Sequence, residues 1–202
     1  KDFVGAVLMA YYPGMEGGRA VAEILFGDVN PSGKLPFVIP VRDGDLPAVV
    51  WDTREQWYSY YHGYRKLDKE KKEPSVPFGF GLSYTEFAVT SPLFTVDEEA
   101  VEAECEVENT GGREGTEVIQ FYVGFSASRH KRPVKTLCGF QRVTIQPGAR
   151  KKVGIICPLD ELAWYNPEYG SWEVEEMVYE GFIGTSSLER DLLSGCFEIR
   201  KN

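Results

Sequence analysis

The sequence predicts a mostly β protein, in which an antiparallel β-sandwich of about seven strands follows a short β-α-β piece. Three observations predict this class. From residue 84 onward, apolar and polar residues alternate, and turn sequences recur at short intervals. Residues 1–40 instead hold a continuous apolar run followed by an amphipathic stretch, the order of a buried parallel strand and its helix. Aromatic residues make up 13% of the chain, which suits a β-rich core.

Residues 1–40 are expected to be the end of a larger α/β sandwich. The apolar run FVGAVLMA at 3–10 has no polar face, as in a strand covered on both sides. Residues 16–28 have the apolar spacing of a helix, with Gly27 at its C′ position. LPFVIP at 35–40 would be the second strand of a parallel pair. Because one such unit cannot cover its own sheet, and the chain opens without Met, we expect a piece of a longer protein.

Residues 41–83 are predicted to be an irregular connecting segment. The mixed-charge run at 66–73, KLDKEKKE, is typical of a solvated loop. The aromatic stretch before it is a contiguous apolar group that a solvated loop does not need. We therefore expect an interface here, formed by Trp57, Tyr58, Tyr60, Tyr61 and Tyr64.

Residues 84–202 are predicted to form the sandwich itself. In AVEAECEVEN at 100–109, apolar residues alternate strictly with acidic ones, so one face should lie in the core. Further strand-like segments follow, separated by turn sequences such as NTGG, QPG and NPEYG. PLDELAWYN at 158–166 should form one helical turn. The aromatics of this region mostly fall at alternating positions that predict burial, among them Phe121, Phe140 and Trp172.

The net charge of −9 argues against a nucleic-acid partner, because phosphate binding requires a basic face. It argues equally against an anionic membrane surface. No apolar run approaches the ~20 residues that a membrane helix requires. We therefore expect neither partner, and the compartment stays open.

The four cysteines are Cys105, Cys138, Cys157 and Cys196, and they are widely spaced. No C-x-x-C pair occurs, and the two histidines lie far from them, so the spacing predicts no metal site. Each cysteine lies in an apolar or alternating segment, which predicts small buried core residues. Disulfides remain open at this point, and no cofactor is expected.

The glycine-rich PGMEGG at 13–18 has the form of an anion-binding turn at a helix N-terminus. It lacks the endings of the phosphate-binding and dinucleotide-binding loops, and Glu16 would repel a phosphate. We favour a structural role, in which the glycines allow a tight turn and close packing. No G-x-S-x-G motif occurs, His62 fits an ordinary loop residue, and no pair among the 31 acidic residues is distinguished, so no catalytic residue is assigned.

Six motifs occur in order along the chain: YYPGMEGGRAVAEILFGDVNPSGKLPFVIP, GYRKLD, PFGFGLSYTEF, RPVKTLCGFQRVTIQPG, DELAWYNPEYGSWEVE and FIGTSS. Together they resemble the C-terminal half of glycoside hydrolase family 3, the β-glucosidase and β-xylosidase family. The resemblance covers essentially the whole chain. It implies that residues 1–40 are the last part of the α/β-sandwich domain and that residues 84–202 form a fibronectin type III-like (immunoglobulin-like) β-sandwich. Residues 41–83 would be the segment that connects the two.

The resemblance also implies a mechanism and a place for it. The family uses a retaining mechanism, with an Asp nucleophile on a (β/α)8 barrel and a Glu acid/base usually on the α/β-sandwich domain. Neither motif occurs in this chain, and Glu16 matches the helix-start glutamate rather than the acid/base. Retaining chemistry needs two carboxyls ~5–5.5 Å apart. The parent protein should therefore be a glycosidase. Its barrel and the rest of its α/β-sandwich domain should be the partners of this chain, and this chain alone should be inactive.

Some positions depart from the family pattern, and other functions stay open. Tyr58 and Ser59 stand where the family often has Glu-Gly, and Phe80 replaces a residue that is often polar. An alternative function is an autonomous fibronectin-like binding module for polysaccharide or a protein partner. The missing domains could also follow the chain in a permuted gene. The sugar and its linkage are undetermined.

Overall fold

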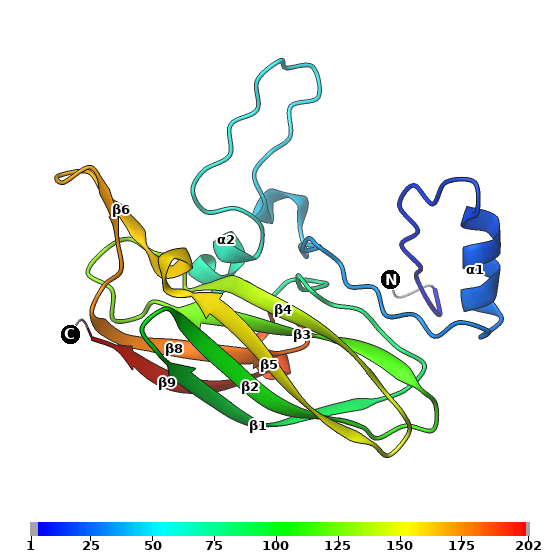
Figure 1. Cartoon of the computed structure of the whole chain (residues 1–202). Helices are drawn as coiled ribbons and strands as arrows, with labels where there is room; N and C mark the ends of the chain where they lie inside the picture. Colours follow the sequence, from blue (N-terminus) through cyan, green and yellow to red (C-terminus); the bar gives the residue numbers. More distant parts are fainter. Residues whose placement is uncertain (1–3, 201–202) are drawn as a thin grey trace.

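The computed structural model describes residues 4–200 and shows an antiparallel β-sandwich with helices and loops along one side (Figure 1). One sheet has the strand order β1-β2-β5 and the other β4-β3-β8-β9. All pairings in both sheets are antiparallel, as expected for an immunoglobulin-like sandwich. The seven predicted strands are confirmed as β1 Phe87–Val96, β2 Ala100–Asn109, β3 Gly115–Gly124, β4 Lys135–Ile145, β5 Arg150–Pro158, β8 Met177–Gly184 and β9 Leu192–Ile199.

The core lies between the two sheets, and the alternation of β2 supplies much of it. Val101 and Val107 are fully buried, while Glu104 on the opposite face pairs with Lys152 of β5 at 2.7 Å. Burying one such side chain contributes about 1.5–3 kcal/mol, whereas an exposed ion pair contributes about 0–1 kcal/mol. Apolar burial therefore sets the register. The large, fully buried side chains of this core include Ile119, Phe121, Val123, Ile145, Leu162, Tyr179 and Ile183.

A hairpin leaves the sandwich between β5 and β8. The predicted helical turn is confirmed as the 3-10 helix η2 (Leu159–Leu162), and β6 (Trp164–Asn166) pairs with β7 (Ser171–Glu173). Residues 171–184 form two strands rather than one, with a break between β7 and β8 (Met177–Gly184). There the Glu175 carboxylate accepts hydrogen bonds from the loop between β3 and β4, so this stretch does not extend the ladder. Two further 3-10 helices are η1 (Asp43–Asp45) and η3 (Glu189–Asp191).

The β-α-β piece is formed only in part. Helix α1 (Gly17–Leu25) is present, and Gly27, with φ of 82°, ends it as predicted. The expected parallel strands do not pair: residues 4–40 have one isolated bridge, which is antiparallel and joins Ile39 to Val76. A buried parallel strand takes its hydrogen bonds from strands on both sides, and the described residues offer no parallel neighbour to residues 4–10 or 35–40. Phe3, the first residue of the predicted run, lies outside the described residues.

Residues 66–70 of the mixed-charge run are helical, so the prediction of a solvated loop was wrong for them, whereas residues 71–73 form an exposed turn. Helix α2 (Gly63–Glu70) places Leu67, which is 2% exposed, against the sandwich. Asp68 forms a 2.7 Å ion pair with Lys135 of β4, and its burial raises its pKa despite that cation. The charges concealed an apolar face, because Tyr64 and Leu67 are three residues apart and lie on the same side of a helix.

The cysteines follow their prediction in part. Cys105 and Cys157 are buried, and burial raises the pKa of the Cys105 thiol to about 11. Cys138 is half-buried, and Cys196 is exposed, so the expectation of burial was wrong for Cys196. It lies on β9, which ends its sheet, and its side chain alternates outward from the buried Phe197. All four are free thiols in this structure.

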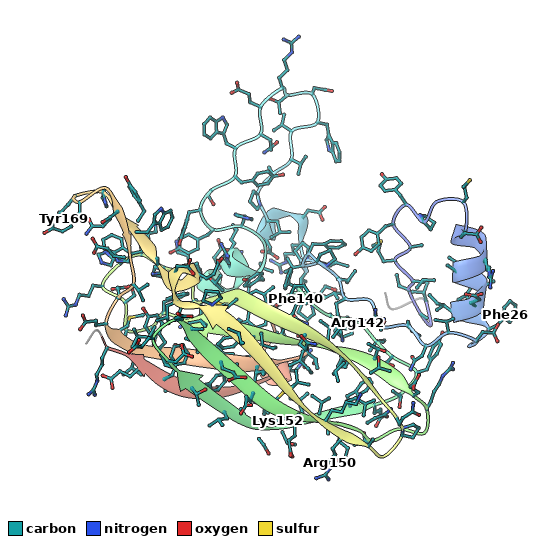
Figure 2. All side chains as sticks on the ribbon, in the orientation of Figure 1. Phe26, Phe140, Arg142, Arg150, Lys152 and Tyr169 are labelled. Carbon is teal, nitrogen blue, oxygen red and sulfur yellow. The ribbon has the colours of Figure 1, made fainter. Side chains whose placement is uncertain are left out.

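Two of the three aromatics assigned to the core lie on the surface instead. Phe121 is fully buried, but Phe140 is 67% exposed and Trp172 71% exposed. Phe140 lies on the outer face of the terminal strand β4, and Figure 2 shows it there, with Tyr169 at the tip of the hairpin. Trp172 belongs to the β6–β7 hairpin, a separate two-stranded sheet that no other sheet covers within residues 4–200. No helix within residues 4–200 has the length and apolar character required to cross a membrane.

Candidate interface site

The predicted aromatic cluster divides into inward-facing and outward-facing parts. Tyr61 is 8% exposed, and its hydroxyl donates to the Arg132 carbonyl oxygen at 3.1 Å. The Tyr64 hydroxyl accepts a hydrogen bond from the Leu137 N–H at 3.0 Å, and its ring meets Tyr122 edge-on at 6.0 Å. These two tyrosines therefore attach the connecting segment to the sandwich of this chain.

The other three cluster residues face outward. Trp57 is 84% exposed, and Tyr58 and Tyr60 are more than half exposed. They belong to a loop, residues 46–60, that projects from the sandwich in Figure 1 (cyan). The Gln56 side chain ties this loop across its base, accepting from the Val50 N–H and donating to the Ala48 carbonyl. The loop thus has internal hydrogen bonds yet exposes apolar rings, which is the property of a surface that another body covers.

The N-terminal segment exposes a second apolar surface. The apolar face expected of α1 is only partly covered among the described residues: Val21 and Ile24 are half-buried, and Phe26 just after the helix is 84% exposed. Glu16 precedes the helix and is exposed, without a side-chain hydrogen bond to it. In Figure 1 this segment (blue) and the 46–60 loop rise from the same side of the sandwich. The exposed apolar residues of this segment include Val4, Val7, Leu8, Met9, Tyr12, Met15 and Leu25.

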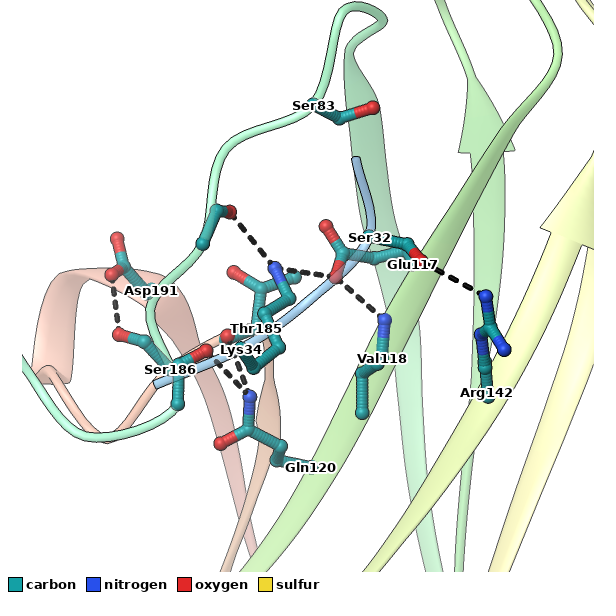
Figure 3. A network of polar contacts seen from close by, with 12 residues as sticks. Ser32, Lys34, Ser83, Glu117, Val118, Gln120, Arg142, Thr185, Ser186 and Asp191 are labelled. Atoms are coloured by element: carbon teal, nitrogen blue, oxygen red, sulfur yellow. Dashed lines mark hydrogen bonds and ion pairs between the residues drawn. The ribbon is translucent and has the colours of Figure 1, made fainter. Parts of the chain in front are cut away.

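A buried ion pair holds the end of the N-terminal piece, residues 1–40, on the sandwich. The Lys34 ammonium lies 2.6 Å from a Glu117 carboxylate oxygen on β3 and donates to the Gly81 carbonyl at 3.0 Å (Figure 3). The two side chains are only 12% and 9% exposed. Arg142 of β4 donates to the Ser32 hydroxyl at 2.9 Å on the same side. A buried pair of this kind tolerates no loss of one partner, because the remaining charge would stay desolvated.

A buried amide makes the second attachment. Gln120 of β3 is 3% exposed, and its amide nitrogen donates to the carbonyls of Gly79 and Thr185. Its amide oxygen accepts from the Tyr122 hydroxyl at 2.6 Å. Gly79 has φ of 80°, and a Cβ there would collide with the Gln120 side chain. The glycine of PFGFGLSY is thus required both by its backbone conformation and by the close approach of this amide.

Sequence reasoning did not select Lys34, Glu117 or Gln120. One signal was present: VIQFYV is apolar on both faces of its strand except at Gln120, which alternates with the core residues Ile119 and Phe121. A buried polar side chain requires partners, so such a position marks a contact with another segment. The partner itself could not be inferred, because Gly79 is 41 residues away in the sequence.

The described residues show no grouping suited to a metal ion: no three His, Cys, Asp or Glu side chains within 4–200 come together. His62 is exposed, with its ring nitrogen Nδ1 near the Ser59 carbonyl, as in an ordinary loop. The buried Glu117 and the half-buried Asp68 each pair with a lysine. The arrangement is suited to joining segments rather than to proton transfer.

Two family models match this chain. The glycosyl hydrolase family 3 C-terminal domain matches residues 1–84, and the fibronectin type III-like domain matches residues 117–187. A beta-glucosidase of Kluyveromyces marxianus is 39% identical over 196 residues, which is 94% of this chain and 23% of that protein. A periplasmic beta-glucosidase of Salmonella typhimurium is 37% identical over 211 residues, or 96% of this chain and 26% of that protein.

Solved structures of beta-glucosidases also match this chain in fold. The K. marxianus beta-glucosidase in complex with glucose superposes with a TM-score of 0.83 at 36% identity, covering 94% of this chain and 24% of that one. Beta-glucosidase 3B of Thermotoga neapolitana gives 0.82 at 34% identity, covering 92% and 27%. This chain therefore spans about a quarter of the length of the relatives it matches. It belongs to glycoside hydrolase family 3, as a portion that holds the C-terminal domain sequence and the fibronectin type III-like sandwich.

Proposed function

We propose that this chain is the C-terminal structural part of a retaining β-glycosidase that hydrolyses β-glucosides or β-xylosides, and that it has no complete active site alone. The observation that carries the proposal is the coverage: relatives named beta-glucosidase match along nearly the whole chain, yet it spans only about a quarter of them. The geometry supports this, because the carboxylates of Glu117 and Asp68 are held by lysines. Two free, adjacent carboxyls are what retaining hydrolysis requires.

The test is a comparison of this chain with the longest open reading frame that contains it. We expect the purified 202-residue chain to leave aryl β-glucosides and β-xylosides unhydrolysed, while the longer protein turns over one of them. Circular dichroism confirms that the short chain is folded. Saturable turnover by the short chain would contradict the proposal, most directly if Glu16→Gln abolished it, since Glu16 would then be an unrecognised acid.

The interface follows from the same proposal. Residues 1–40, 41–83 and 84–202 are proposed as the end of the α/β-sandwich domain, the connecting segment and the sandwich. The exposed rings of the 46–60 loop and the exposed apolar residues before and along α1 would contact the rest of the parent enzyme, meaning the barrel and the remaining α/β-sandwich domain. Within the predicted cluster, Trp57, Tyr58 and Tyr60 would make this contact. Tyr61 and Tyr64 would position this surface, because their hydroxyls form hydrogen bonds with backbone atoms of the sandwich domain.

Trp57→Ala tests the interface. In the longer protein we expect a loss of about 3 kcal/mol in stability, because a large ring is removed from a covered site. In the 202-residue chain the same change should have little effect, since Trp57 is 84% exposed there. Phe140→Ala, at a similarly exposed ring on the sandwich, is the matched control and should change neither protein. Thermal unfolding of both substitutions in both proteins is the measurement. Equal changes in melting temperature from Trp57→Ala in the two proteins would rule the interface out.

The exposed hairpin aromatics keep a second candidate function in view. Trp172 and Tyr165 lie edge-to-face with their ring centres 5.6 Å apart, and both are at least half exposed. Rings displayed this way suit a binding module for polysaccharide or a protein partner better than a sandwich core. Co-sedimentation with insoluble glucan or xylan distinguishes this function from a purely structural one.

A further inference from the structure

A cavity of about 360 Å³ opens between the loop joining β3 to β4 and the β6–β7 hairpin. Arg129 and His130 line it from the loop, and Trp164 and residues 173–176 line it from the hairpin and the stretch after it. This volume lies within the range of about 300–1,000 Å³ that is usual for small-molecule sites. No residue of the connecting segment is among those that line the cavity, although Tyr61 of that segment contacts Arg132 in the same loop.

The aromatic wall of this cavity is held in place. The His130 and Trp164 rings stack with their centres 3.4 Å apart and an interplanar angle of 21°. Glu175 fixes the loop that carries His130, because it accepts from the Ser128 hydroxyl at 2.6 Å and from the Arg129 N–H at 3.1 Å. A ligand would therefore meet a wall that is already ordered, which lowers the entropic cost of binding.

The carboxylates of the cavity are partly neutralised. Glu173 accepts from the Asn166 amide and the Ser171 hydroxyl through one oxygen. Beside Glu175 lies Arg132, whose side chain is 8% exposed and whose Nη1 is 3.8 Å from the carboxylate. That Nη1 has no hydrogen-bond partner among the described residues. Its positive charge offsets Glu175, so the cavity offers acceptor oxygens without being a strongly negative site.

We infer that this cavity binds one ring of a neutral saccharide. Its walls combine an aromatic surface, a guanidinium donor at Arg129 and carboxylate acceptors at Glu173 and Glu176. A sugar hydroxyl both donates and accepts, so it can use both kinds of group, whereas an ammonium ion only donates. The apolar C–H face of a pyranose suits the ring wall. A metal ion does not suit the site, since these carboxylates do not converge with His130 into a metal-binding group.

Fluorine NMR of the 202-residue chain labelled with 5-fluorotryptophan tests the inference. The chain has four Trp, and single Trp→Phe variants assign their resonances. Titration with cellotetraose or xylotetraose should shift the Trp164 resonance saturably, with a Kd on the order of millimolar. Glu176→Gln should weaken binding about fivefold, because a charge-assisted hydrogen bond becomes a neutral one.

Trp172 is the built-in control for this experiment. It lies across from Tyr165 in the ribbon, so its side chain points to the face opposite Trp164 and should not respond. An unchanged Trp164 signal at tens of millimolar saccharide would overturn the inference, as would a shift of Trp172 alone or a stronger response to choline. Each result leaves the proposed structural role untouched, because that role is tested by turnover and not by saccharide binding to this chain.

Discussion

Glu117→Gln is expected to lower the free energy of unfolding by about 3 kcal/mol, because it leaves the Lys34 ammonium buried without its counter-charge. The loss should be concentrated where the end of the N-terminal piece, residues 30–40, lies on β3. We therefore expect faster hydrogen exchange at residues 30–40 as well as a lower midpoint in urea. Lys34→Met removes the other partner and should cost a similar amount, since Glu117 would then be the unpaired charge.

The matched control is an ion pair of the same kind at the surface. Arg190 and Glu73 lie 2.9 Å apart, but their side chains are 71% and 63% exposed. Glu73→Gln should therefore change stability by no more than about 0.5 kcal/mol. If Glu117→Gln and Glu73→Gln had equal effects, the buried pair would not be what attaches the segment. The double variant Lys34→Met, Glu117→Leu should recover much of the loss, because neither charge then remains buried.

Gln120→Leu should destabilise the chain by about 3 kcal/mol or more. Its amide serves the Gly79 and Thr185 carbonyls and the Tyr122 hydroxyl, all of which would lose a buried partner. Each unsatisfied buried group costs about 1–3 kcal/mol. Leucine keeps most of the volume, so the loss reports hydrogen bonds rather than a cavity. Urea unfolding followed by tryptophan fluorescence measures it.

Gln141→Leu is the control for this second variant. Gln141 lies on the neighbouring strand β4, but its side chain is exposed and its one hydrogen bond, to the Arg142 carbonyl, is long at 3.4 Å. We expect a change within about 0.5 kcal/mol. Similar losses of unfolding free energy from Gln120→Leu and Gln141→Leu would show that the hydrogen bond between Gln120 and Gly79 does not stabilise the attachment.

Much of the fold could be predicted because its determinants are local. The two-residue alternation of β2 is visible in AVEAECEVEN, and the structure buries Val101 and Val107 as that pattern requires. Gly27 marked the end of α1 through a preference that only glycine satisfies easily. Patterns of this kind depend on residues at most a few positions apart, so one sequence is enough to detect them.

The predictions that were wrong concern residues whose environment is set by distant parts of the chain. KLDKEKKE appeared solvated, yet α2 is held by Leu67 packing on a sandwich whose strands come later in the chain, and by Asp68 pairing with Lys135. The burial expected for Phe140 and Cys196 was wrong because both lie on outer faces of end strands, and strand order is not visible in a periodicity. Alternation shows that one face is buried but not which strand ends a sheet.

The sequence by itself determined the family and the seven-strand sandwich, because these depend on local patterns and on motifs in order. Only the tertiary structure decided which residues attach the N-terminal piece and the connecting segment to the sandwich. It also separated Tyr61 and Tyr64, which face inward, from Trp57, which faces outward. These assignments rest on contacts such as Lys34 with Glu117 and Tyr61 with Arg132, which join residues far apart in the sequence. Folding alone brings such residues together, so no local pattern contains them.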